Sequence, residues 1–160
     1  MLYAMENRIE KLLWSMAFPG LSQLLHRKYW KGVLFIGLEF LVNVQSHFNE
    51  IIMSSFQGDI PKAISQANYQ WLMFYPCLYF FAAWDTYRDV TGEKSRYSYL
   101  PFVLSAYLVT VGVMYSPSFT IFGLLLGPVW LPILCCFVGI GLGLPLKWLL
   151  LKLIHEREMD

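Results

Sequence analysis

The stretch KGVLFIGLEFLVNVQSHF, residues 31–48, decides the fold of this chain. It is long and apolar enough to cross a bilayer as a helix, which needs ~20 mostly apolar residues. A carboxylate, Glu39, nonetheless lies near its middle, and Asn43, His47 and Glu50 follow at helical spacing on the same face. An ionisable residue at membrane depth usually faces protein or water rather than lipid. The stretch therefore predicts a membrane helix with one polar stripe.

The composition of the whole chain predicts the same class. Of its 160 residues, 57% are hydrophobic, 18% aromatic and 14% charged, whereas soluble domains carry about 25% charged residues. The charges cluster between long apolar runs, which is the pattern of a multi-pass membrane protein. The net charge of +1 does not favour nucleic acid as a partner. The length predicts one membrane domain, residues 1–160, with the lipid bilayer as its surroundings.

We expect an all-α integral membrane protein with about four transmembrane helices. The predicted spans are residues 31–48, 69–84, 99–115 and 119–146. Residues 12–25 are too short for a span and are broken by Pro19-Gly20, which predicts a re-entrant or interfacial helical hairpin. Residues 147–158 predict an amphipathic tail helix at the interface. An extra crossing at residues 12–25 or 119–152 remains open.

The basic residues predict the orientation. Residues 26–31, the loop 85–98 and the tail carry several basic residues each, whereas the loop 49–68 carries one lysine and the turn 116–118 none. With four spans, every basic segment falls on one side, as the positive-inside rule requires. We therefore expect both termini in the cytoplasm.

Residues at the predicted cytoplasmic interface form a second candidate site. The basic-aromatic segment offers His26, Arg27, Lys28 and Tyr29, and the end of the second span offers Asp85 and Arg88. The last two are spaced for an i, i+3 ion pair, and a contact from Asp85 to Arg27 or Lys28 is the alternative. Either contact favours a register lock between two segments over catalysis.

The small residues and the cysteines predict packing. Gly123/Gly127 and Gly139/Gly143 are small-xxx-small pairs that let helix backbones approach closely. The cysteines Cys77, Cys135 and Cys136 lie in apolar runs without metal-ligand spacing, which favours buried apolar side chains. The sequence indicates no catalytic residues, and we expect no metal and no cofactor.

The segments AFPGLSQLLHRKYWKGVLFI, residues 17–36, and WDTYR, residues 84–88, carry a family resemblance. They resemble the small bacterial membrane proteins related to the TM-two (two-transmembrane-helix) domain, over residues 12–40 and 76–88. The matching positions are Pro19, Gly20, His26, Arg27, Tyr29, Gly32 and Asp85. The resemblance implies a bacterial plasma-membrane protein and names no activity.

Three functions are compatible with these observations. The first is a non-catalytic accessory or scaffold subunit of a larger membrane complex of the transporter or export type, binding other integral membrane subunits or itself. The second is a small homo-oligomeric transporter or channel that uses the Glu39 stripe, and the third is a lipid-acting membrane enzyme. Glu39 itself is either a partner or ion contact or a carboxyl satisfied inside the bundle, with Ser22, Gln23, Tyr75 and Tyr79 as its candidate partners.

Overall fold

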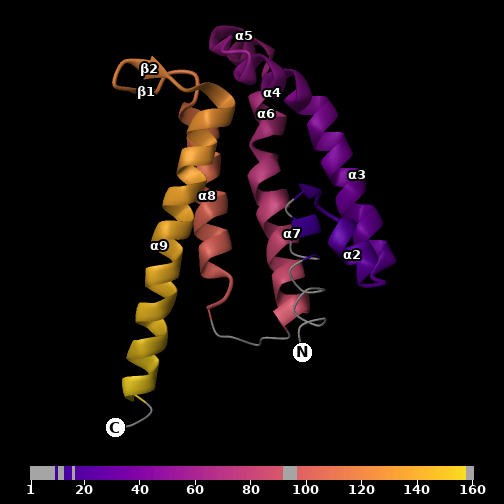
Figure 1. Cartoon of the computed structure of the whole chain (residues 1–160), viewed down its shortest axis with the longest axis vertical. Helices are drawn as coiled ribbons and strands as arrows, with labels where there is room; N and C mark the ends of the chain where they lie inside the picture. Colours follow the sequence, from indigo (N-terminus) through magenta and orange to yellow (C-terminus); the bar gives the residue numbers. More distant parts are fainter. Residues whose placement is uncertain (1–9, 11–12, 16, 92–96, 158–160) are drawn as a thin grey trace.

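Helices make up about 80% of the chain, which confirms the all-α class. The computed structural model describes residues 10, 13–15, 17–91 and 97–157, without the side chains of residues 155–157. The elements are α2 (Leu21–Leu25), α3 (Tyr29–Ser46), α4 (Phe48–Phe56), α5 (Ile60–Gln66), α6 (Tyr69–Leu72), α7 (Phe74–Thr91), α8 (Leu100–Tyr115), β1 (Thr120–Ile121), β2 (Leu124–Leu125) and α9 (Gly127–Arg157). Figure 1 shows the long helices running side by side, with α4, α5 and α6 gathered at one end.

The first described segment is a helical hairpin. Residues 13–15 and 17 are helical, residues 18–20 turn, and α2 follows; residues 12 and 16 of the predicted hairpin lie outside the described part. Gly20 adopts a left-handed φ of 98°, and a Cβ there would lie 2.8 Å from the Gly32 carbonyl oxygen of α3. A Cβ on Gly32 would in turn lie 2.5 Å from Leu24. These two glycines let α2 pack directly on the start of α3.

Helix α3 ends earlier than residues 31–48 predict. His47 adopts a left-handed conformation, with φ 60°, and separates α3 from α4. The prediction that Glu39, Asn43, His47 and Glu50 share one continuous helix face is therefore wrong, because the break redirects the chain. The following loop holds the capped helix α5, where Asp59 accepts a hydrogen bond of 3.2 Å from the Lys62 backbone N–H.

The second predicted span, residues 69–84, is divided and then extended. The short helix α6 ends at Leu72, and α7 begins at Phe74 with Pro76 in its first turn. Proline has no backbone N–H, but N–H groups in the first turn make no hydrogen bond within the helix, so none is lost there. Helix α7 continues to Thr91, so residues 85–91 are helical rather than part of a polar loop. Residues 92–96 of that predicted loop lie outside the described residues.

The last predicted span also differs in its bounds. Residues 119–126 form the two-residue strands β1 and β2 and their turn, with Thr120 opposite Leu125, rather than the start of a helix. Helix α9 then runs for 31 residues without a break. The predicted tail helix, residues 147–158, is therefore the continuation of α9 as far as Arg157.

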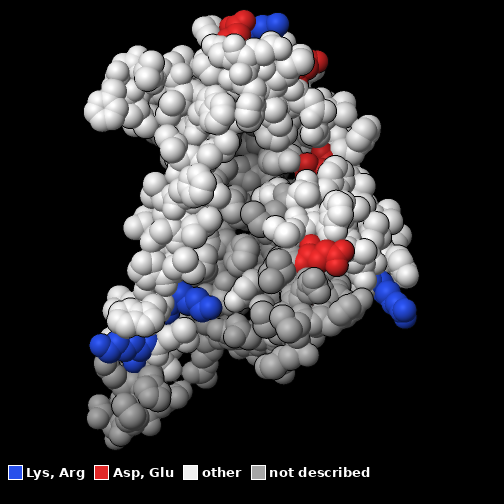
Figure 2. Space-filling model, in the orientation of Figure 1, with Lys and Arg blue, Asp and Glu red and all other residues white. Residues whose placement is uncertain are grey.

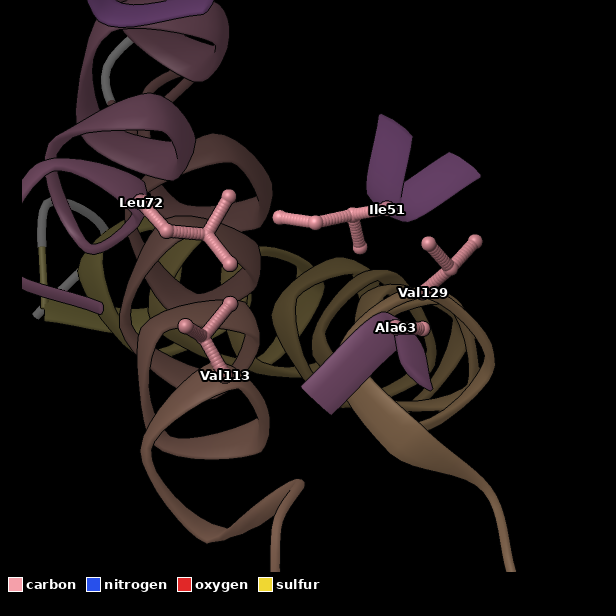
Figure 3. Packing of buried hydrophobic residues seen from close by; sticks show 5 residues of the cluster. All are labelled: Ile51, Ala63, Leu72, Val113 and Val129. Carbon is pink, nitrogen blue, oxygen red and sulfur yellow. The ribbon is translucent and has the colours of Figure 1, made fainter. Parts of the chain in front are cut away.

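The apolar core lies at the α4–α6 end of the molecule. It consists of the buried residues Ile51, Ala63, Leu72, Val113 and Val129. These side chains come from α4, α5, α6, α8 and α9 and point toward one another (Figure 3). Away from this core, Figure 1 shows α7 and α9 diverging, while α7 stays packed on α8, where the ring centroids of Tyr87 and Phe102 are 5.6 Å apart.

The prediction of four membrane spans is not confirmed. The segment Gly127–Ile154 of α9 has 28 residues and is long and apolar enough to cross a membrane, and no second helix among the described residues meets both conditions. Helix α8, with 16 residues, extends ~24 Å at 1.5 Å per residue, short of the ~30 Å hydrocarbon core. Glu39 and Asn43 lower the hydropathy of α3, and charged residues end α7.

Candidate functional site

The buried carboxylate Glu39 joins α3 to α7. Its side chain is 4% exposed, and its Oε1 accepts a hydrogen bond of 2.7 Å from the Tyr75 hydroxyl. Its Oε2 is buried and has no hydrogen-bond partner among the described residues. Tyr75 was one of the four candidate partners, whereas Gln23 bonds elsewhere. The ring of Tyr75 packs against Phe48 and Tyr79, with centroids 4.5 Å and 6.1 Å away.

The other members of the predicted stripe lie away from Glu39. The Asn43 side chain donates to Asn49 at 3.4 Å near the end of α3. His47 and Glu50 are both about half exposed, and the atoms His47 Nδ1 and Glu50 Oε1 are 3.9 Å apart. Glu50 also accepts from Gln66 at 3.5 Å. The structure therefore brings His47 and Glu50 together at the α4–α5 surface, whereas Glu39 is buried beside Tyr75.

A polar network fastens α2 and the start of α3 to the end of α7. Gln23, which is 1% exposed, donates through Nε2 to the Ala82 carbonyl oxygen at 3.1 Å and to Thr86 Oγ1 at 3.2 Å. The same amide lies 3.4 Å from Asp85 Oδ2. We call the side chains Gln23, Lys28, Lys31, Asp85, Thr86, Arg88 and Asp89 the α2–α7 polar network.

Two carboxylates carry the ion pairs of this network. Asp85 is 1% exposed and pairs with Lys31 at 3.0 Å and with Arg88 at 3.3 Å. Lys28 pairs with Asp89 through both carboxylate oxygens, at 2.6 and 2.7 Å. The Asp85–Arg88 spacing read from the sequence is thus an ion pair. The cation that reaches Asp85 from α3 is Lys31 rather than Arg27 or Lys28, because Lys28 lies over Asp89 one turn further along α7.

The remaining interface candidates shape the α2–α3 turn. The His26 backbone N–H donates to the Ser22 carbonyl oxygen at 3.0 Å. Arg27 adopts a left-handed φ of 58°, and its N–H donates to the Leu24 carbonyl oxygen at 2.9 Å. Tyr29 begins α3 with its side chain exposed. These three residues place Lys28 and Lys31 within reach of α7.

The glycines separate into packed and unpacked positions. A Cβ on Gly139 would lie 2.5 Å from the Ser105 backbone, and one on Gly143 would lie 2.5 Å from the Pro101 backbone, so both let α9 approach α8 closely. Gly123 lies in the β1–β2 turn with no atom within 4 Å of its Cβ position. Gly127 begins α9 against Ile60. The expectation that Gly123 and Gly127 form a helix-packing pair is therefore wrong.

An apolar cleft separates α7 from α9. One hollow of about 330 Å³ lies beside the apolar core, and a second of about 400 Å³ follows it. The two hollows share three lining residues, Tyr79, Phe80 and Cys136. Figure 2 shows the surface hollowed between the α8–α9 pair and α7. The Tyr75 side chain lines the first hollow, so the Glu39–Tyr75 hydrogen bond lies behind the cleft wall.

Sequence reasoning missed the network residues Gln23, Lys31, Thr86 and Asp89. The signal was present, since Lys28 and Lys31 are spaced i, i+3 on one helix and Asp85 and Asp89 are spaced i, i+4 on another. It was overlooked because residues 85–91 were interpreted as a loop. A loop gives acidic residues no common face.

Comparisons with protein families, curated proteins and solved structures find no match for this chain. Among the described residues, no group of three or more His, Cys, Asp and Glu side chains is placed to hold a metal ion. Cys77 is exposed, whereas Cys135 and Cys136 are partly buried, and Cys135 faces Gly112 of α8.

Proposed function

We propose that this chain is a non-catalytic accessory or scaffold subunit of a larger bacterial membrane complex of the transporter or export type. In this proposal α3, α7, α8 and α9 cross the plasma membrane, both termini lie in the cytoplasm, and partner subunits bind through the outward faces of membrane helices. The α2–α7 polar network then lies at the cytoplasmic interface, and α4–α6 lie at the opposite surface.

One observation carries the proposal: α3 and α9 present apolar faces that the rest of the chain leaves uncovered. Of the apolar span window in α9, only 28% is buried within the chain. Gly37 of α3 and Gly141 of α9 lie mid-helix on exposed faces, and no atom lies within 4 Å of a Cβ built on either. Because small residues allow a second helix to approach closely, these positions favour helix–helix contact with another subunit.

The distribution of charge supports the membrane setting. On the face in Figure 2, the described surface over α8 and α9 shows no charged side chains until the lower part of α9, where basic side chains lie. In α9 these residues include Lys147 and Lys152. A long apolar helix that ends in lysines beside Trp148 fits a cytoplasmic membrane boundary.

The geometry favours the structural interpretation of Glu39. Its Oε1 is occupied by Tyr75 inside the chain, and a 4% exposed side chain offers no surface to a partner. The break at His47 also removes the continuous stripe on which a homo-oligomeric transporter or channel depended. We therefore propose that Glu39 orders α3 on α7, while partners contact the apolar faces.

Co-purification tests the proposal. The tagged full chain is extracted from its native membrane in mild detergent, and the proteins that come with it are identified by mass spectrometry. We expect a stable set of integral membrane proteins that is lost in Gly37→Leu or Gly141→Leu at unchanged expression. Gly143→Leu is the contrast, since its side chain collides with Pro101 inside the chain and lowers folded yield instead. Recovery of this chain alone, or of an unchanged set with both outward variants, contradicts the proposal.

A further inference from the structure

The second hollow of the cleft has a defined depth. It is lined on α9 by Cys136, Ile140, Leu144 and Lys147, at helical spacing, and on α7 by Tyr79, Phe80, Ala83 and Tyr87. From Cys136 to Lys147 the helix rises ~16 Å at 1.5 Å per residue. This is about half of the ~30 Å hydrocarbon thickness of a bilayer. The hollow therefore matches the depth of one leaflet.

Among the described residues, charge is confined to one end of this hollow. Lys147 is the one charged residue of the described lining, and the core-facing end is closed by apolar and aromatic side chains. Lys147 is half-buried and forms no ion pair with any described residue. A half-buried ammonium at the mouth of an apolar cleft is complementary to an anionic group attached to an apolar chain.

The cleft walls suit a flexible chain better than a second helix. Membrane helices pack through small residues, and Gly139 and Gly143 of α9 are already occupied by α8. The walls are instead bulky, with Phe80, Tyr87 and Phe102 among the lining residues. A space of about 400 Å³ lies within the ~300–1,000 Å³ range of small-ligand sites.

We propose that the cleft between α7 and α9 binds one anionic phospholipid, with an acyl chain along the apolar walls and the headgroup phosphate on Lys147. The proposal goes beyond the subunit role and does not depend on it, since the partner surfaces there are the outward faces of α3 and α9. The lipid would fill the space where α7 and α9 diverge (Figure 1), with Phe102 of α8 among the residues that line it.

Native mass spectrometry of the purified full chain in mild detergent tests this site. Phosphatidylglycerol is added in increasing amounts, and phosphatidylcholine with the same chains is the neutral comparison. We expect one phosphatidylglycerol per chain, bound more tightly than phosphatidylcholine. Lys147→Gln should weaken phosphatidylglycerol binding about fivefold, the effect of one basic residue on an anionic lipid surface, and should leave phosphatidylcholine unchanged.

Matched variants on the same helix separate the cleft from the rest of the surface. Lys152→Gln removes an equal charge outside the cleft lining, where Lys152 lies 5.7 Å from the Trp148 ring centroid, and should change nothing. Leu144→Trp fills the cleft and should abolish retention of both lipids, whereas Leu142→Trp, exposed and outside the lining, should not. Equal losses from the two lysine variants, equal affinity for the two lipids, or a second copy of the chain in place of lipid would overturn the proposal.

Discussion

Asp85 offers an asymmetric test of the α2–α7 polar network. Its carboxylate is 1% exposed, whereas the Lys31 and Arg88 side chains are 47% and 48% exposed. When Asp85→Ala removes the anion, both cations return to water, and the loss is that of charge-assisted hydrogen bonds, about 2 kcal/mol of unfolding free energy. When Lys31→Met and Arg88→Met are combined, Asp85 stays buried with the Gln23 amide as its only partner among the described side chains, which costs about 3–5 kcal/mol.

The assay is reversible unfolding in mixed micelles as the mole fraction of denaturing detergent rises. Tryptophan fluorescence is a direct probe, because Trp84 lies beneath Arg88 with the guanidinium carbon 4.8 Å from its ring centroid. Adding Asp85→Leu to the double variant should recover much of the loss, since no buried charge remains. Lys62→Met, an exposed position outside the network, should shift stability by less than about 0.5 kcal/mol. If the double variant is no less stable than Asp85→Ala, the burial argument is refuted.

Three further substitutions test other parts of the fold by the same unfolding assay. Tyr75→Phe strands the buried Glu39 carboxylate and should cost about 1–3 kcal/mol; an unchanged midpoint would mean that this hydrogen bond contributes nothing. Gly139→Leu forces α9 away from Ser105 and should cost at least about 1–3 kcal/mol, with a fall in folded yield. His47→Gly relieves a left-handed backbone at the α3–α4 break and should stabilise by about 1 kcal/mol, whereas a loss there would contradict the assigned conformation.

The apolar runs predicted where most of the long helices lie, but several helix ends differ from the predicted bounds. The segment predicted as residues 99–115 is helical from Leu100 onward, and most of the segment 31–48 is helical in α3, because apolar residues and helix breakers coincide there. The Asp59 cap of α5 is a local feature of this kind, because the capping side chain and the Lys62 backbone N–H lie within four residues. The extension of α7 to Thr91 was missed, because its charged last turns look like a loop until α2 and α3 supply their partners.

The candidate site was likewise predicted in part. Tyr75 was among the predicted partners of Glu39, but the distance of His47 and Glu50 from that carboxylate depends on a single left-handed residue. A positive φ at histidine carries a local energetic penalty and leaves no pattern in hydropathy. The β1–β2 turn was also missed, because an apolar run that reverses direction has the same composition as one that forms a helix.

The two ends of the molecule are held by different forces, and this explains where the cleft lies. At one end the side chains of α4, α5, α6, α8 and α9 meet in an apolar core. At the other, the α2–α7 polar network joins α2 and α3 to α7 but includes no residue of α8 or α9. Helices α8 and α9 hold each other through glycine contacts instead. The polar network therefore orients α7 without closing it on α9, and the space left between them is apolar along its length and ends at Lys147.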